Sequence, residues 1–494
     1  MPRQPLTLLM PLLMPLLLIA CTPQPHNIQQ TPTPAPIWPD YTDVTIPPDI
    51  APLNISALHA DAIHVTLTTP HGNTLTSQGT TTNFPINQWH ALLANAIGQD
   101  ITVSVLSLLN GQWRQHPDFH IHISTDSIAD YGITYRKIAP GYETYSNIGI
   151  YQRDLHTFRE DPILTHTLLP GQCIGCHTQN QANPHDLTIH IRGSHPATLI
   201  QHTHNNTTTQ QWLTTTTNST PASCTYPYWH PSGRYCAYSL NKVHQAFLTD
   251  PHKPIEVFDL ASDICILDIN TNQLILSPQL QTPQLQTWPA FSPDGHTLYY
   301  CSAQPQPVPA QAHKIHYDLL SITFNPDSAT LGTKPQTLLH TPNHSITLPR
   351  PSYDGRYIVY CLADYGCFPI NHPEADLYIY NLHTHTTKPL TAANSPDTES
   401  FHNWNSNSHW LLFSSRRHDT LTSLIYFTHI DNNGNATKPF LLPQQDPLNY
   451  YTLSLQSFNT PDFTTTKINI NPRNAYNNTF SNKRTQVTIK QQKQ

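Results

Sequence analysis

Four copies of one short pattern stand in this 494-residue chain, and this repeat limits the possible folds more than any other feature. Each copy places a polar turn before a strand of alternating apolar residues, which is the chemistry of a tight β-hairpin. The copies read YPYWHPSGRYCAYS, WPAFSPDGHTLYYCS, LPRPSYDGRYIVYCL and FHNWNSNSHWLLFSS. Their turns lie at Gly233, Gly295, Gly355 and Ser408, so successive copies are 62, 60 and 53 residues apart.

Further strand-like runs follow each copy, namely DICILDI, YDLLSITF, ADLYIYNL and SLIYFTHI. A turn with about four short strands per repeat is typical of a β-propeller blade. Upstream, NIGIYQRDL and LTIHIRG are expected to supply one or two more blades. We therefore predict an all-β protein with a propeller of about five to seven blades. In the fourth copy Ser408 replaces the turn glycine, which is expected to weaken that hairpin.

Changes in composition divide the chain into segments. Alternating runs such as DAIHVTLTT and DITVSVLSLL predict a small β-domain, in which NQWHALLANAI is the one plausible short helix. The C-terminal tail contains Lys and Arg without acidic residues and has little to bury, so we expect it to be disordered. The predicted segments are a lipoprotein signal peptide at 1–20, a Pro-rich extended tether at 21–47, the small β-domain at 48–130, the propeller at 131–465 and the disordered basic tail at 466–494.

The N-terminus is typical of an exported bacterial lipoprotein. Arg3 precedes an apolar run that Pro11 and Pro15 interrupt, so the run is too short to span a membrane as a helix. It ends in Leu-Ile-Ala-Cys, which resembles a lipobox with Cys21 as the lipidated residue. We expect a lipid-anchored protein of the cell envelope that faces the periplasm, because no acidic run of the kind associated with surface export follows Cys21.

The unusual composition limits the functional conclusions that can be drawn from single residues. Charged residues make up 11% of the chain, against about 25% in typical soluble proteins. The enriched residue types share codons that begin with A and C, so nucleotide skew explains the 31 histidines better than metal binding does. A net charge of −7 without a basic stripe in any folded region argues against nucleic acid as a partner.

One motif is not explained by the composition of the chain. The stretch LLPGQCIGCHTQNQ holds Cys173, Cys176 and His177 in the order C-x-x-C-H, for which composition alone predicts about 0.01 occurrences. The surroundings are expected to form a loop, whereas a thioredoxin-like dithiol needs a strand-to-helix junction. Structural zinc needs a second ligand pair, and the sequence has no second C-x-x-C. The motif therefore predicts one covalent haem c, with two thioethers and His177 as the proximal iron ligand.

A resemblance supports this interpretation. The segments WHPSGRY, FSPDGHTLYY and PSYDGRYIVY resemble the TolB-type propeller repeat, which is also described as PD40 or WD40-like. Most of residues 130–460 resembles a family of TolB-like propeller lipoproteins from Bacteroidetes-type genomes that carry one cytochrome c haem motif. The resemblance implies a propeller with a haem segment at about 166–196, and it implies little about a reaction.

The second axial ligand of this haem can be narrowed by elimination. The only methionines lie in the signal peptide, which excludes His/Met coordination in the mature chain. A second His, an unusual ligand such as Lys, and an open site remain. His190 in TIHIRG is favoured over His166, His185 and His195, since the resembling family has a His-x-Arg-Gly there. Arg192 in the same motif is a candidate partner for a haem propionate.

The remaining features favour a carrier or binding protein over an enzyme. Neither G-x-S-x-G nor H-E-x-x-H occurs, and the few glutamates are expected to be structural. Six further cysteines form either disulfides, such as one between Cys361 and Cys367, or free buried thiols: Cys224, Cys236, Cys265, Cys301, Cys361 and Cys367. We predict electron transfer to an envelope redox partner, and the alternative is a non-catalytic scaffold that binds a protein or polymer. A haem enzyme acting on a small oxidant at an open iron is a third interpretation.

Overall fold

The computed structural model describes residues 24–140, 147–205, 207–250, 252–253, 255–481 and 483–492. The predicted signal peptide and the predicted lipidation site Cys21 lie outside the described residues. Among the described residues, no helix has the length and apolar character needed to cross a bilayer.

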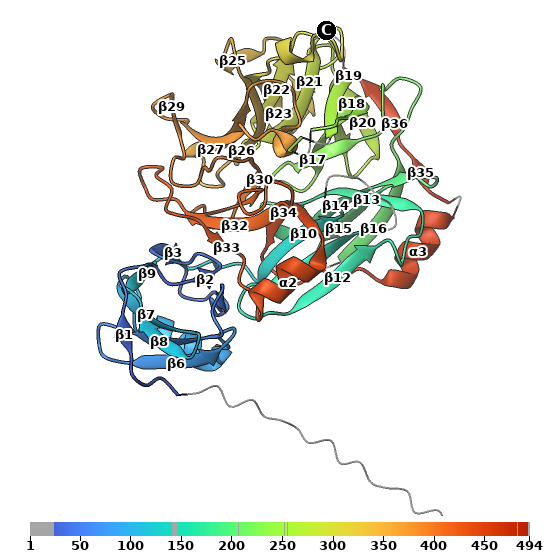
Figure 1. Cartoon of the computed structure of the whole chain (residues 1–494). Coiled ribbons are helices and arrows are strands. Elements are labelled where there is room, and N and C mark those ends of the chain that lie inside the picture. The colour runs from blue at the N-terminus through green and yellow to red at the C-terminus, as the bar shows by residue number, and fades with distance from the viewer. Residues whose placement is uncertain are drawn as a thin grey trace, which may run out of the picture.

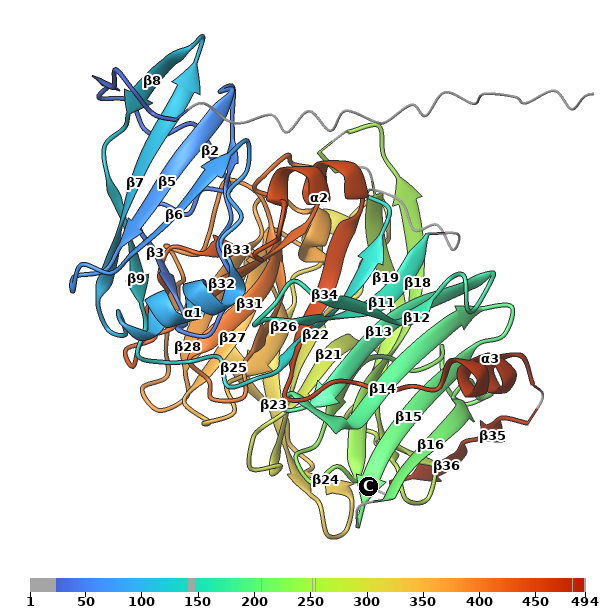
Figure 2. The same ribbon diagram turned by 90° about the horizontal axis from the view of Figure 1, so that it is seen from below.

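The N-terminal part is a seven-stranded sheet with one helix (Figures 1 and 2). The order β1-β8-β7-β5-β6 is extended by β9 on β7 and by β3 on β9. The helix α1 lies in the segment that was expected to be helical. The elements are β1 (Gln29–Gln30), β2 (Ile37–Trp38), β3 (Val44–Ile46), β4 (Ser56–Ala57), β5 (Ala62–Thr68), β6 (Thr74–Gly79), α1 (Ile86–Ala94), β7 (Asp100–Leu109), β8 (Gln112–Gln115) and β9 (Phe119–Ile123).

The segment predicted as a tether is folded over much of its length. Ile37, Tyr41, Val44 and Ile46 are buried, and β3 pairs with β9. Their apolar side chains belong to a core cluster that also contains residues of the last blades, so the sheet and the propeller share one core. Proline-rich composition concealed this, because proline restricts the backbone without preventing the side chains between prolines from packing.

The rest of the chain forms six β-sheets arranged as propeller blades, which confirms the predicted all-β propeller. The innermost strands β34, β13, β17, β21, β26 and β30 contact one another in a closed ring. The first three blades contain β10 (Gly132–Ile138), β11 (Ile148–Asp154) and β12 (Glu160–Thr165); β13 (Gln172–Asn180), β14 (Asn183–Gly193), β15 (Ala197–His204) and β16 (Thr207–Thr214); and β17 (Thr225–Trp229), β18 (Tyr235–Phe247), β19 (Ile255–Asp268) and β20 (Gln273–Leu276).

The last three blades correspond to the second, third and fourth copies of the repeat. They contain β21 (Leu285–Phe291), β22 (Thr297–Ala303), β23 (Asp318–Asn325), β24 (Thr330–Leu331) and β25 (Gln336–Leu339); β26 (Ser345–Pro351), β27 (Tyr357–Ala363), β28 (Asp376–Asn381) and β29 (Thr386–Pro389); and β30 (Glu399–Trp404), β31 (Trp410–Ser415), β32 (Leu424–His429) and β33 (Phe440–Leu441). Short 3₁₀ turns lie at Ala312–Lys314 and Pro369–Asn371.

The C-terminal region closes the ring and then wraps its outside. After α2 (Pro447–Ser454), β34 (Ser457–Thr464) pairs with β10 and becomes the innermost strand of the first blade. Beyond it, α3 (Pro472–Phe480), β35 (Thr485–Gln486) and β36 (Thr488–Gln491) follow, and the two strands extend the second and third blades (Figure 1, red). The tail predicted to be disordered is therefore ordered along its described length.

The repeated turns share one backbone geometry. Gly233, Gly295 and Gly355 have φ values of 70°, 75° and 75°, and Ser408 adopts the same left-handed conformation with φ 63°. In each turn the amide of this residue donates to the carbonyl three residues earlier. The fourth copy thus keeps the turn despite its serine. The Ser408 hydroxyl accepts a hydrogen bond from the Asp354 amide at 3.3 Å, which offsets part of the conformational cost.

A pair of glycine substitutions separates backbone strain from crowding. A Cβ at Gly355 meets open space, so Gly355→Ala should lower the free energy of unfolding by about 1 kcal/mol through φ alone. A Cβ at Gly295 would overlap the His230 imidazole, which contacts the Gly295 carbonyl at 3.0 Å. Gly295→Ala should therefore cost clearly more in urea unfolding. Equal costs for the two variants would contradict the inter-blade contact.

Candidate functional site

The C-x-x-C-H motif lies on the innermost strand of the second blade. The segment was predicted to be a loop, but residues 172–180 form β13, which pairs antiparallel with β14. The register shifts between Ile174 and His177, so Gly175 and Cys176 form an irregularity in the ladder. The loop prediction was wrong because it rested on the Gly, Gln and Pro residues of the local sequence. Pairing with the neighbouring strands determines the conformation here.

The two cysteines of the motif have different surroundings. Cys173 is completely buried beside Ile138 and Ile148, and its Sγ atom accepts a hydrogen bond from Nη2 of Arg192 at 3.2 Å. Cys176 is partly exposed and lines a cavity on the propeller axis. The structure therefore brings Cys176 to a space that can hold a ligand and keeps Cys173 behind the wall of that space.

His177 is buried and neutral. Its Nε2 atom lies 2.9 Å from the Thr134 hydroxyl, and its Nδ1 atom has no hydrogen-bond partner among the described residues. Burial, aided by the positive charge of Arg136, lowers the pKa of His177 to about 3. An imidazole held neutral is the form that ligates a metal.

The structure does not bring His190 and His177 together. His177 pairs directly with Ile189, so the adjacent His190 points to the opposite face of the blade, where its Nδ1 lies 3.3 Å from the Thr198 hydroxyl. Burial lowers the pKa of His190 to about 3. Ligation of one iron by both imidazoles would require β13 and β14 to separate.

The cavity at Cys176 is central. It measures about 160 Å³ and receives side chains from five of the six blades, which places it on the propeller axis. Its walls carry apolar and aromatic groups, including Tyr226, Phe368 and Phe401. Three arginines line it, and the described residues of its lining include no carboxylate: Arg136, Arg192 and Arg416. Such a cavity favours a ligand that combines an apolar body with negative charge.

Arg416 is the most buried of these arginines. Its Nη2 atom donates to the His252 carbonyl at 2.8 Å, and its Nε atom lies 4.0 Å from the Asp397 carboxylate. The Nη1 atom has no hydrogen-bond partner among the described residues. Burial lowers the pKa of Arg416 from its usual range. A partly satisfied, buried guanidinium at the cavity wall is suited to receive an anionic group.

A second, smaller cavity adjoins the first. It measures about 30 Å³, and its lining shares Cys176, Tyr226 and Phe401 with the first cavity and adds His177 and His402. Cys176 and His177 therefore both reach the axial space, Cys176 from within the irregularity and His177 from the first paired position after it.

His402 is a residue of this site that the sequence did not indicate. It lies on β30, and its Nε2 contacts the Val359 carbonyl at 2.9 Å while Nδ1 has no partner among the described residues. Burial lowers the pKa of His402 to about 3. The available signal was its place in the fourth repeat, but one histidine among 31 attracts no notice. The other sequence candidates, His166, His185 and His195, do not line either cavity.

The remaining cysteines are free thiols among the described residues, including Cys361 and Cys367, which were considered as a pair. Two of these sulfurs lie near each other in a buried core, where the Sγ atoms of Cys224 and Cys265 are 3.7 Å apart. Cys301 and Cys361 occupy equivalent, fully buried positions of successive blades. These side chains therefore pack as small apolar residues.

The described glutamates serve the structure. Glu160 accepts from Lys137 and Tyr450, and Glu399 accepts from Arg417 and from Ser415 in a fully buried position. Glu256 contacts Lys253, Tyr365 and His372, and Glu374 pairs with His372 at 2.9 Å. Each carboxylate is held by partners, which agrees with the expectation of structural roles.

The donor set fits a c-type haem in its chemistry and only partly in its geometry. A thiol and an unpartnered buried imidazole nitrogen reach the axial cavities, and guanidinium groups suited to propionates surround them. Cys173 is the misfit, since its sulfur must move out of its buried cluster before a second thioether can form. The bulge at Gly175 and Cys176 is the place where β13 can change its path.

Fold and site together define a six-bladed β-propeller that shares its core with an N-terminal sheet and carries a Cys/His motif at its axis. No protein-family model matches the chain, and a search of curated proteins finds no match.

Solved structures resemble the architecture. TolB from Acinetobacter baumannii is 12% identical with a TM-score of 0.43, and the alignment covers 77% of this chain and 85% of that one. The Synechocystis apocarotenoid oxygenase mutant is 11% identical with a TM-score of 0.40, over 89% and 97% of the two chains. The Niastella koreensis GH74 enzyme is 13% identical with a TM-score of 0.39. The alignment covers 64% of this chain and 46% of that enzyme. None of these likenesses assigns an activity to this chain.

Proposed function

We propose that this chain is an exported, lipid-anchored haem c protein of the bacterial cell envelope that transfers electrons. In this proposal the propeller provides the docking surface for a redox partner, and Cys21 provides the membrane anchor on the periplasmic side. The observation that carries the proposal is the C-x-x-C-H motif whose Cys176 and His177 both reach the axial cavities.

Each site residue has a defined task in this proposal. Cys173 and Cys176 would hold the haem through two thioethers, and His177 would supply an iron ligand. Arg192 and Arg136, which both line the cavity, would receive the propionates, because a guanidinium binds a carboxylate with two parallel hydrogen bonds. The aromatic and aliphatic walls exclude water from the cofactor, which supplies one-electron redox chemistry when bound.

A substitution of the motif cysteines tests the attachment. The double variant Cys173→Ser, Cys176→Ser should carry no covalent haem when it is expressed in cells competent in cytochrome maturation. Cys367→Ser is the matched control, since it removes another buried thiol outside the motif and should retain the haem. The readout is a peroxidase stain after denaturing electrophoresis. Haem retained by the double variant would contradict the assignment.

Redox spectra test the function itself. A reversible potential titration without carbon monoxide binding is the result that an electron carrier should give. A spectral shift with carbon monoxide would instead indicate an open iron position, and it would favour a role in which the iron binds a small ligand.

The second candidate function is a non-catalytic scaffold that binds a protein or polymer and uses the haem as a structural or sensory group. The three arginines at the axial cavity favour it, because they suit an anionic group on such a partner. Partner binding that persists in the cysteine double variant would support this function over electron transfer.

A further inference from the structure

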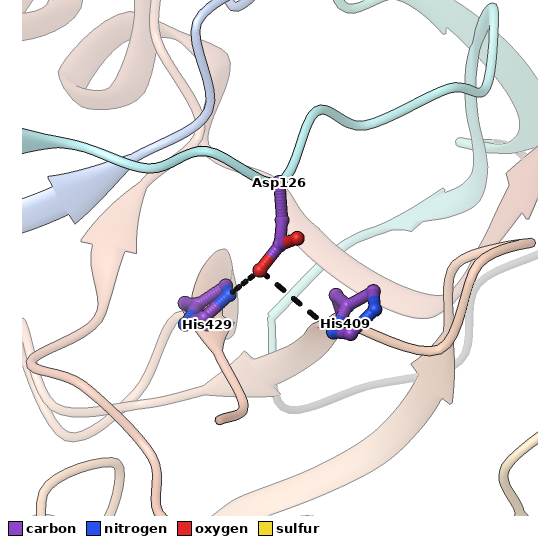
Figure 3. Close-up of side chains that lie close together, drawn as sticks. All are labelled: Asp126, His409 and His429. Carbon is purple, nitrogen blue, oxygen red and sulfur yellow. Dashed lines mark hydrogen bonds and ion pairs between the residues drawn. The ribbon is translucent and has the colours of Figure 1, made fainter. Parts of the chain in front are cut away.

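Three side chains from distant parts of the sequence meet where the N-terminal sheet contacts the sixth blade (Figure 3). Asp126 lies in the connection that follows β9, whereas His409 and His429 lie at the start of β31 and at the end of β32. The three donor atoms all lie within 4.8 Å of one another. The group is separate from the axial cavities, and none of its members lines them.

The two imidazoles approach a single carboxylate oxygen. Nε2 of His429 lies 2.7 Å from Oδ2 of Asp126, and Nδ1 of His409 lies 3.8 Å from the same atom. Figure 3 shows both contacts converging on that oxygen. A distance of 3.8 Å is too long for a hydrogen bond, so a direct bond does not explain the orientation of His409. A cation bound at about 2.0–2.2 Å from each donor atom would explain it.

Neighbouring groups hold these ligands in place. Trp410 is fully buried, and its Nε1 atom donates to the Asp126 carbonyl at 3.0 Å. Its ring packs against the His429 imidazole, with the two ring centroids 5.0 Å apart. The Asp126 amide donates to the Ser124 hydroxyl at 3.0 Å. The backbone and ring positions are therefore set before any ion binds, which lowers the cost of binding.

The exposure of the group leaves room for a solvent ligand. The side chains of Asp126, His409 and His429 are 33%, 28% and 14% exposed. Two imidazoles and one carboxylate with a water in the fourth position are a ligand set that Zn²⁺ accepts in a tetrahedral arrangement. Imidazole ligands disfavour Mg²⁺ and Ca²⁺, which prefer oxygen.

We propose that Asp126, His409 and His429 form a site for a divalent transition-metal ion, with Zn²⁺ as the best fit, that fastens the N-terminal sheet to the propeller. Asp126 comes from the sheet side and both histidines come from the last blade, so the ion bridges the two parts. The site does not depend on haem attachment.

Binding of Zn²⁺ to untagged, chelator-treated full-length protein tests the site. His409→Gln removes one ligand that makes no short contact with Asp126, so it should leave the apo fold intact while weakening Zn²⁺ binding. We expect the Zn²⁺ affinity to fall by more than about 100-fold. Loss of an outer-shell partner costs up to about 100-fold, and His409 is proposed as a direct ligand. The matched control is His185→Gln, an exposed histidine on the second blade, which should bind Zn²⁺ as the parent does.

Two readouts make the outcome decisive. Calorimetry should give one tight site in the parent and in His185→Gln, and none in His409→Gln. Zn²⁺ should also slow hydrogen exchange of the connection around Asp126 in the parent and in His185→Gln, but not in His409→Gln. Equal affinity in His409→Gln and the parent, or no tight site in the parent, would overturn the proposal.

Discussion

A chain that ends at residue 456 should fail to fold, whereas one that ends at residue 465 should fold with reduced stability. The first truncation removes β34, which pairs with β10 and, among the described strands, is the one that joins the two ends of the ring. It also removes the buried Phe458 and Phe463. Without that strand the first blade exposes the inner edge of β10, and the last blade loses its neighbour.

The second truncation removes only the wrapping segment. Ile468 and Val487 are buried, and burial of such side chains contributes about 1.5–3 kcal/mol each. Ile468 also exchanges two backbone hydrogen bonds with the Gln152 side chain. Circular dichroism and urea unfolding of both truncated chains check the prediction. A cooperative transition in the chain that ends at residue 456 would show that the ring does not need its C-terminal closure.

Removing His402 should flatten the pH dependence of stability. The pKa of His402 is about 3 in the folded chain and about 6.5 in an unfolded one, so the unfolded state binds more protons between these values. The stabilising contribution of the neutral form is complete above about pH 6.5, and it is lost as the pH falls. The slope is about 1.4 kcal/mol per pH unit, so about 3 kcal/mol is at stake between pH 6 and pH 4.

Other buried groups also contribute to the pH dependence of the free energy of unfolding. His190 acts in the same direction as His402, because burial also lowers its pKa to about 3. Asp462 opposes them, because burial raises its pKa to about 7. Its contribution is complete below about pH 3.8 and is lost as the pH rises toward 7. Asp263 opposes them too, because burial raises its pKa to about 6, so the difference in slope between the parent and the His402 variant, rather than the total slope, is the quantity to be tested.

The variant His402→Gln keeps a donor for the Val359 carbonyl and removes the titrating group. Urea unfolding at several values between about pH 4 and pH 6 should show a slope that is smaller by about 1.4 kcal/mol per unit. Asn403→Gln on the same strand serves as the control, since it alters packing without removing a titrating group. A parent slope retained in His402→Gln would contradict a buried, neutral imidazole.

The repeat predicted most of the fold because each copy encodes a local turn. Gly233, Gly295 and Gly355 need a left-handed backbone, and the turns lead into largely apolar strands that are buried at nearly every position directly after the turn. The runs NIGIYQRDL and LTIHIRG indicated the first two blades, but the closure of the first blade by β34 was not visible, since β10 and β34 pair across most of the chain. The wrapping tail was missed for a related reason: β35 and β36 are short polar strands that are ordered only by the edges they extend.

The sequence indicated the axial site only through residues that lie close together along the chain. The spacing of Cys173, Cys176 and His177 identified the motif, but nothing in it revealed that β13 would be a buried strand. His402 and Arg416 reach the same axial space from the last blade, and only the closed ring brings them there. The separation of His190 from His177 follows from strand register, which the sequence does not specify for two neighbouring apolar runs.

The intact mass of the mature chain, produced with the cytochrome maturation machinery and denatured before measurement, tests the central claim most directly. Covalent attachment predicts that, after denaturation, the mass exceeds that of the processed chain lipidated at Cys21 by one haem, and that a fragment containing Cys173 and Cys176 carries this added mass. A fragment with Cys173 and Cys176 at its unmodified mass, from cells in which another exported cytochrome c matures normally, would contradict it.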